Sequence, residues 1–283
     1  MPEENKEPLP PSRREFIVRT AQGACAGALV YSAADSQMLS VTRLRIPMER
    51  LPSEFAGFKI GFASDFHLGP AVPAATLRRA VELLNGAKPD VVLLGGDYVD
   101  EDSELVKRCM EILSGLRARE GVYSVQGNHD YWVGSGSYSA ALAESTSIKD
   151  LSKRGFAVRR SSGVLWIAGI DDNWGGNPDF SASVAGAPEG APRVVFTHNP
   201  TLADELPEAY ADLILAGHTH GWQIYVPGIT KLFMPLESMR KYRAGFYKTK
   251  AGLMYVSRGV GVIYPFIRLW CSPEVVIITL VPA

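Results

Sequence analysis

Short apolar runs alternate with longer segments of helical spacing through the first half of the chain. The runs at 59–64, 90–95 and 121–126 have the length and apolar character of buried strands. Apolar residues recur at helical spacing in the segments 74–85, 103–115 and 138–153. The second half carries short apolar runs with short connections, at 164–169, 193–197, 212–216, 222–226, 253–257 and 275–280. This order predicts an α/β fold in which two sheets pack face to face with helices outside.

The composition narrows the class of protein. With 46% hydrophobic and 21% charged residues, the 283-residue chain can bury a sizeable core and is neither disordered nor fibrous. Its 29 Lys and Arg residues nearly balance 30 Asp and Glu residues, so the chain lacks the positive field that sequence-independent nucleic-acid binding needs. We therefore expect no nucleic-acid partner. The three cysteines are too widely spaced for a zinc cluster or a disulfide framework, and Cys109 lies in an apolar stripe typical of a core.

The first 35 residues differ from the rest of the chain. The pair Arg13-Arg14, followed by Phe16 and by an uncharged stretch at 20–34 that ends in small residues, resembles a twin-arginine export signal. We predict a leader at 1–35 and a single domain at 36–283, with export to the periplasm or to the outer face of the cytoplasmic membrane. An uncleaved leader that serves as an anchor is the second choice, because the stretch is shorter than the roughly 20 residues that span a bilayer.

Candidate chemistry gathers where predicted strands end. Five of these strands run directly into segments rich in Asp, His and Asn, and all five histidines of the chain fall in them. Open α/β sheets place their sites at the carboxyl ends of strands, so these side chains are expected to meet. In an extended chain the two outer side chains of Asp-x-His and of His-x-His would point to the same side. The five segments are Asp65-Phe66-His67, Gly96-Asp97, Gly127-Asn128-His129-Asp130, His198-Asn199 and Gly217-His218-Thr219-His220.

The ordered set resembles the calcineurin-like metallophosphoesterases, whose pattern is D-x-H, G-D, G-N-H-[DE], H and G-H-x-H. The resemblance runs from about residue 60 to 221 and implies a four-layer α/β/β/α sandwich with two divalent metal ions. It implies that Asp97 bridges the two ions. It further implies that Asp65, His67 and His220 complete one metal site and that Asn128, His198 and His218 complete the other.

Two neighbouring residues receive other roles from the same resemblance. His129 stands beside a ligand without being one, and by analogy it stabilises or protonates the leaving oxygen of the substrate. Asp130 is predicted to lie behind the ligands and to orient the ring of His129, although a turn residue explains it equally well. The segment Asp171-Asp172-Asn173-Trp174 also ends a predicted strand and is a candidate border of the pocket. Both acids can be turn or cap residues, and we leave them out of the site.

The predicted ligands indicate which metals can bind and which reaction they can support. Nitrogen and oxygen ligands without a thiolate fit Mn, Fe or Zn, and the sequence does not distinguish these three. Two such cations stabilise charge on phosphoryl oxygens and lower the pKa of a bound water from 15.7 to roughly 7, which supplies a nucleophile for phosphate-ester hydrolysis.

The substrate class is predicted from the flanking segment 231–250. Six cationic residues stand there against Glu237 alone, interleaved with apolar residues, a pattern that fits an anionic lipid headgroup or a membrane surface but also an ordinary solvated strand. We predict a phosphodiesterase or pyrophosphohydrolase that acts on a cell-envelope or lipid-linked phosphate, including a UDP-diacylglucosamine-like one. The alternatives are a small-molecule phosphomonoesterase and a metal-binding envelope protein without hydrolytic activity. Retention of His129, which no metal needs, speaks against the last of these.

Overall fold

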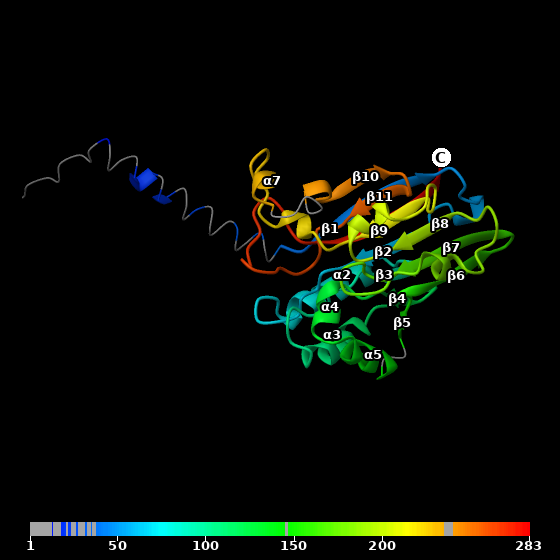
Figure 1. Cartoon of the computed structure of the whole chain (residues 1–283), viewed down its shortest axis with the longest axis horizontal. Helices are drawn as coiled ribbons and strands as arrows, with labels where there is room; N and C mark the ends of the chain where they lie inside the picture. Colours follow the sequence, from blue (N-terminus) through cyan, green and yellow to red (C-terminus); the bar gives the residue numbers. More distant parts are fainter. Residues whose placement is uncertain are drawn as a thin grey trace, which may run out of the picture.

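Two six-stranded sheets form the centre of the computed structural model, which describes residues 38–144, 147–234 and 240–283 together with 13, 18–20, 22–23, 27, 32 and 35. The strand order is β1-β12-β2-β3-β4-β5 in the first sheet and β10-β11-β9-β8-β7-β6 in the second. Strands β2 to β5 run parallel to one another, as do β7, β8, β9 and β11. Figure 1 shows the two sheets side by side, with α2, α3 and α5 gathered on one side of them.

The strands and helices have the following bounds. The first sheet contains β1 (Ser40–Met48), β2 (Lys59–Ala63), β3 (Val91–Leu94), β4 (Val122–Ser124), β5 (Ile148–Asp150) and β12 (Glu274–Pro282). The second contains β6 (Lys153–Arg160), β7 (Gly163–Ile170), β8 (Arg193–Phe196), β9 (Leu213–Ala216), β10 (Gly245–Thr249) and β11 (Gly252–Val256). The helices are α2 (Ala74–Gly86), α3 (Leu105–Leu113), α4 (Asn128–Trp132), α5 (Ser135–Glu144), α6 (Phe180–Val184) and α7 (Thr230–Phe233), and the 3-10 turns are η1 (Ser53–Phe55), η2 (Pro200–Asp204) and η3 (His220–Trp222).

Three apolar layers hold the sheets and helices together. Successive residues of a strand point to opposite faces, so Val92 and Leu94 of β3 pack against α2, α3 and α5, while Val91 and Leu93 pack between the sheets. Strand β9 divides in the same way, with its outer face covered by η2, α6 and the loop residue Tyr242. Strands buried on both faces explain the continuous apolar runs of the sequence. The predicted four-layer α/β/β/α sandwich is confirmed, although short turns and α6 form the fourth layer.

Most predicted elements are present, but two predicted segments differ and three strands were not predicted. The helix predicted at 138–153 ends at Glu144, and β5 and the start of β6 follow. The strand predicted at 222–226 is wrong, because η3 occupies its start and Ile224 makes only an isolated bridge to Leu269. Strands β1, β6 and β10 were not predicted, because each is partly exposed and alternates polar with apolar residues. An edge strand of this kind lacks the apolar run that the prediction relied on.

Two described residues of the amino-terminal segment, Ser32 and Asp35, contact the domain. Ser32 and Asp35 are buried, with the Ser32 hydroxyl donating to the carbonyl of Arg268 (2.7 Å) and Asp35 accepting from the amide of Cys271 (3.2 Å). Most of the predicted leader, including Arg14, Phe16 and Cys25, lies outside the described residues. Among the residues that are described, no helix has the length and the hydrophobicity to cross a bilayer.

Candidate metal centre

Five loops converge at one edge of the two sheets. They follow β2, β3 and β4 in the first sheet and β8 and β9 in the second, and together they carry every predicted ligand. Asp65, His67, Asp97, Asn128, His198 and His220 are each at most 2% exposed, and His218 is half-buried. Strands that run parallel deliver their carboxyl ends to the same edge, which is why residues up to about 150 positions apart in sequence meet here.

The backbone of these loops is not extended, contrary to the prediction for Asp-x-His and His-x-His. Asp65 (φ 54°) and His67 (φ 46°) both occupy the left-handed region, as do His218 (φ 70°) and His220 (φ 50°). Asp97, with φ 55°, is a fifth case. Few residues other than glycine adopt this conformation, and clusters of such strained residues are typical of functional sites. Asp65 and His67 therefore face one group through a strained turn instead of a flat strand, whereas His218 and His220 contact two different groups.

One group of possible ligands consists of Asp65, His67 and His220. The Nε2 atoms of His67 and His220 lie 3.1 Å apart, and the Nε2 of His220 lies 3.5 Å from Oδ1 of Asp65. Their ligand atoms fall within 4.8 Å of one another, as a shared cation requires. The Nδ1 atoms of both histidines are buried without a hydrogen-bond partner among the described residues.

A second group surrounds the Nε2 atom of His198. Oδ1 of Asn128 lies 3.1 Å from this nitrogen, and Nδ1 of His218 lies 3.2 Å from it. The Nδ1–H of His198 donates to the carbonyl of Gly95 at 2.7 Å, so Nε2 is the nitrogen that faces the group. Oδ1 of Asn128 and Oδ2 of Asp97, which are both acceptors, lie 3.1 Å from this nitrogen. A proton or a bound cation at this place satisfies these atoms, so the residues fit a metal ion.

Asp97 joins the two groups through one oxygen. Its Oδ2 lies 3.4 Å from Nε2 of His67 and 3.1 Å from Nε2 of His198, while its Oδ1 accepts from the amide of His129 at 2.9 Å. A carboxylate held in this way presents Oδ2 to both groups. Gly127 makes the arrangement possible, because a Cβ there would lie 2.2 Å from Oδ1 of Asp97. Metal binding by these seven residues stays a prediction, and the structure brings all seven together.

The pKa values of the buried groups show that the site stabilises a positive charge near Asp97. Burial opposes ionisation of Asp97, but its contacts with His198 and His67 outweigh burial and hold the pKa of this carboxyl well below its usual range. Burial likewise opposes charge on His198, yet Asp97 raises the pKa of this ring to about 10. Burial and the charge of His198 lower the pKa of His218 to about 3, so that ring is neutral and free to coordinate.

His129 lies beside the ligands at the mouth of the site. Its Nδ1–H donates to the carbonyl of Asp100 at 2.7 Å, and its side chain is 16% exposed, whereas those of His67 and His198 are completely buried. Its ring stands edge-on to that of His67, with centroids 4.7 Å apart. One nitrogen of His129 also falls within ligand distance of His67 and Asp97. Because only Nε2 is left without a partner, His129 can serve a substrate atom from this place.

Asp130 does not hold His129, and this part of the prediction is wrong. The carboxylate of Asp130 accepts from the amides of Asp97 (2.8 Å), Tyr98 (2.9 Å) and Gly127 (2.8 Å), while the backbone of Asp100 orients the His129 ring. Asp130 thus supports the loops on either side of Asp97 from behind the ligands. Burial and the charge of Asp97 raise the pKa of Asp130 to about 7.

Asp100 was not predicted from the sequence, whereas Trp174 lies beside His218, as expected for a segment predicted to border the pocket. The carboxylate of Asp100 lies 3.7 Å from Nδ1 of His67 and 3.6 Å from Nδ1 of His129, and contact with His67 lowers its pKa. Asp100 lies three residues after Asp97, and this short spacing could have predicted that Asp100 also lies near the site. Trp174 stands edge-on to His218, with ring centroids 4.6 Å apart. Asp172 holds the loop of Trp174 by accepting from the amides of Trp174 and Gly175, which confirms its interpretation as a turn residue.

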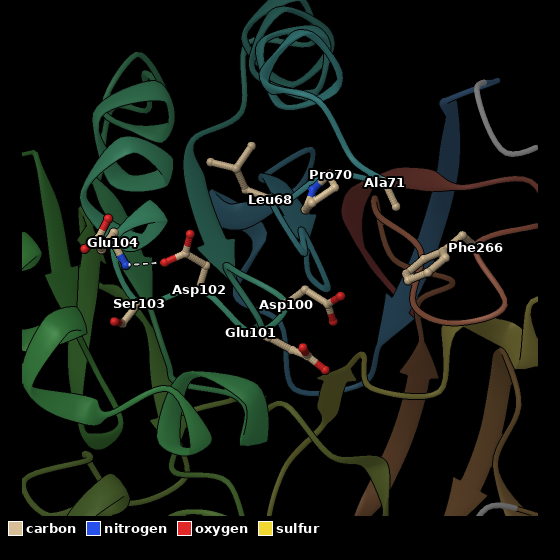
Figure 2. A pocket seen from close by; sticks show the side chains of 10 residues that line it. Leu68, Pro70, Ala71, Asp100, Glu101, Asp102, Ser103, Glu104 and Phe266 are labelled. Carbon is tan, nitrogen blue, oxygen red and sulfur yellow. Dashed lines mark hydrogen bonds between the residues drawn. The ribbon is translucent and has the colours of Figure 1, made fainter.

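An open cleft of ≈ 940 Å³ begins at Asp100 (Figure 2). Apolar side chains line one part of it and acidic side chains the other, with Asp102 accepting from the amide of Glu104 at 2.9 Å. Figure 2 shows Phe266 facing the cleft from the opposite side to Glu104. No Lys or Arg of the described residues lines it. The lining residues are Leu68, Gly69, Pro70, Ala71, Asp100, Glu101, Asp102, Ser103, Glu104 and Phe266.

Comparison with known proteins shows which family the chain resembles. The sequence profile described as calcineurin-like phosphoesterase matches residues 58–222. The chain is 34% identical to a phosphodiesterase of Escherichia coli named YaeI, over 95% of this chain and 99% of that protein. It is 29% identical to YkuE, an uncharacterised metallophosphoesterase of Bacillus subtilis, over 95% of this chain and 97% of the relative. The structure of TT1561 from Thermus thermophilus superposes on 72% of the chain and 90% of its own, with a TM-score of 0.49 and 13% identity.

Proposed function

The chain belongs to the calcineurin-like phosphoesterase family and is a phosphoester hydrolase, and we propose that it hydrolyses phosphodiesters with two divalent cations. The observation that carries the proposal is the shared oxygen of Asp97, 3.4 Å from His67 and 3.1 Å from His198. When bound, two such cations supply charge to the phosphoryl oxygens and lower the pKa of water, and Mn, Fe and Zn all suit these ligands. Asp65, His67 and His220 would hold one of them, and Asn128, His198 and His218 the other.

His129 is the residue that would protonate the leaving oxygen of the substrate. Its Nδ1–H is committed to the carbonyl of Asp100, so Nε2 is the nitrogen left to act on the departing oxygen, to which it gives a proton when the ring carries one there. The carboxylate of Asp100, 3.6 Å from Nδ1, stabilises positive charge on the ring. The edge of the His67 ring lies against His129 and restricts its rotation.

The acidic cleft favours a phosphodiester over a diphosphate. It begins at Asp100, on the side of the site where His129 meets the leaving group, and four carboxylates line it. A second phosphate on the leaving group would be repelled there, whereas a neutral or cationic alcohol would not. The E. coli relative is named a phosphodiesterase, which supports the same choice.

The test compares three substrates on one purified, metal-loaded sample. We expect kcat/KM for bis(4-nitrophenyl) phosphate to exceed that for 4-nitrophenyl phosphate at least about tenfold if the enzyme is a phosphodiesterase. A UDP-sugar serves as the diphosphate substrate. Faster turnover of the monoester would support the phosphomonoesterase alternative, and faster turnover of the UDP-sugar would support the pyrophosphohydrolase. Turnover of none of them by a protein with both metals would support the non-hydrolytic reading.

We further propose that the substrate is membrane-associated and meets the protein at one apolar rim. The rim consists of α7 and the loop 264–270, which an isolated bridge between Ile224 and Leu269 brings together. Leu232 (73% exposed) and Phe233 (76%) project from α7, and Tyr264 and Trp270 project from the loop. Phe266 belongs to both the rim and the cleft. Exposed aromatic and aliphatic residues beside a cation such as Lys231 fit an anionic lipid surface.

Not every cation of 231–250 is available for lipid. Lys241 pairs with Asp204 (2.7 Å), and the guanidinium of Arg243 stacks 3.8 Å above the Tyr225 ring. The proposed membrane contact therefore depends more on the exposed apolar side chains of the rim than on the cations of 231–250. Replacing both Leu232 and Phe233 by Ser should reduce sedimentation with anionic vesicles severalfold without changing turnover of a soluble diester. Phe246→Ser, at an exposed aromatic of β10 that packs on Tyr255, is the matched control. Equal sedimentation of all forms would remove the rim from the proposal.

Location outside the cytoplasm is proposed from the leader alone. Replacing both Arg13 and Arg14 by Lys should retain a folded enzyme in the cytoplasm, because the twin-arginine route recognises the pair. Arg19→Lys is the matched control, since Arg19 lies outside the pair. Export of the double variant at the level of the wild type would contradict this route.

A further inference from the structure

Arg268 is the largest side chain that is completely buried among the described residues. It lies in the connection between β11 and β12, outside every motif of the sequence analysis. Its guanidinium donates to the carbonyl oxygens of Arg258 (2.6 Å), Gly261 (2.6 Å), Cys271 (2.9 Å) and His220 (3.2 Å). A buried charge is costly unless it is well hydrogen-bonded, and this one is bonded to three separate segments of backbone.

Two of these segments carry or contact residues of the Asp65, His67 and His220 group. His220 belongs to that group, so Arg268 holds the backbone of a ligand directly. The segment 258–261 packs on Asp65: the amide of Val260 donates to the carbonyl of Ser64 (3.0 Å) and the amide of Gly261 to that of Asp65 (2.6 Å). The approach is close, because a Cβ on Gly259 would lie 2.6 Å from Cβ of Asp65.

The group of Asn128, His198 and His218 has no such contact with Arg268 among the contacts that the described residues make. His198 is held by the carbonyl of Gly95, and the amide of His218 donates to Oδ1 of Asp65. The hydrogen bonds of the Arg268 guanidinium therefore reach one side of the centre.

We propose that Arg268 is a positioning residue that sets the distance between Asp65 and His220 and so builds the first metal site. The inference rests on the proposed function, because it assumes that this group binds a cation. A planar guanidinium reaches carbonyls in several directions at once, whereas a lysine ammonium on a flexible stem cannot match that fork. Cys271 supports the same backbone from the other side, with its Sγ 3.3 Å from the carbonyls of His220 and Gly221.

The test is a metal titration of the full chain after removal of metal with a chelator. Co²⁺ is added, its visible absorption is followed, and bound metal is counted for wild type, Arg268→Lys and Arg160→Lys. Arg160 is the matched control, because it pairs with Asp90 (2.6 Å) ahead of β3, at the opposite ends of the strands from the site. We expect wild type and Arg160→Lys to bind two equivalents. Arg268→Lys should bind one normally and the other at least about tenfold more weakly.

The outcomes separate the inference from the proposed function. Wild type that binds no Co²⁺ would overturn both. Two unchanged equivalents in a folded Arg268→Lys protein would overturn the inference alone. Equal weakening of both sites would also overturn it, because a merely structural residue would act in that way. If Arg268→Lys does not fold, Arg268→Gln, which keeps two N–H donors without the charge, is measured under the same criteria.

Discussion

At the scale of single residues, the histidines around Asp97 differ in the proton they carry. His198 has a pKa raised to about 10, while the pKa of His218 is lowered to about 3. The charged ring of His198 stabilises the metal-free fold below the ordinary pKa near 6.5, and this contribution is lost as the pH rises through about 10. A metal ion must displace that proton to use Nε2.

Metal binding is therefore expected to release about one proton from His198 at pH 7 to 8 and to tighten as the pH rises toward 10. Calorimetric titration of the metal-free protein in two buffers of different ionisation enthalpy counts this proton. Asp97→Asn removes the charge that raises the pKa of His198 and should reduce the release. Binding without proton release in the wild type would show that His198 is already neutral.

Replacement of His129 by Ala should leave both metals in place and lower kcat by about a hundredfold or more, because the proposed role of the ring is to donate to the leaving oxygen and the two proposed ligand groups are complete without it. The loss should be smaller for a nitrophenyl ester than for an alkyl ester, since a good leaving group needs less help from an acid. Parallel kinetics on the two esters, with metal analysis, check this. Equal losses on both would assign His129 another role.

The residues of the candidate metal centre could be predicted from sequence because they lie in short motifs, but the residues that support them could not. Asp130 follows His129 directly, so its neighbour in sequence was taken for its partner, whereas it accepts from the amides of Asp97 and Tyr98, far back in the chain. Arg268 has no motif and bonds to backbone carbonyls, which any sequence can supply. Contacts of this kind depend on how the loops pack, and sequence spacing does not report that packing.

At the scale of elements, the buried strands and α2 were predicted well because their apolar patterns are continuous. The helix predicted at 138–153 ran too far, since Ile148 and Leu151 continue the helical spacing although they belong to β5 and its loop. The apolar run at 222–226 packs against the loop of Leu269 instead of joining a sheet. The periodicity of apolar residues indicates which side chains are buried. Tertiary packing decides whether those residues form a helix, a strand or a loop.

The turn between β4 and α4 gives a prediction at this scale. Gly127→Ala would place a Cβ 2.2 Å from Oδ1 of Asp97 and 2.7 Å from its amide, so the turn or the carboxylate must move. We expect at least about tenfold weaker metal binding and a loss of about 1–3 kcal/mol in the free energy of unfolding. Gly86→Ala, at the end of α2 where a Cβ meets nothing within 4 Å, is the matched control. Metal titration and thermal unfolding of both variants check this, and unchanged binding by Gly127→Ala would contradict it.

At the scale of the whole molecule, the site exists only because two sheets meet along one edge. The first sheet supplies Asp65, Asp97 and Asn128 through its loops, and the second supplies His198 and His218. The apolar layer between the sheets fixes their relative position and therefore the spacing of the two ligand groups. Asp97, near the middle of this arrangement, contacts both groups.

The most direct test of this account is the metal content and diester turnover of Asp97→Ala beside the wild type. The wild type should carry two equivalents of divalent metal and hydrolyse bis(4-nitrophenyl) phosphate. Asp97→Ala should lose metal from both sites and lose turnover, while Asp65→Ala should mainly empty one site. Two full equivalents of metal in an active Asp97→Ala protein would contradict the account.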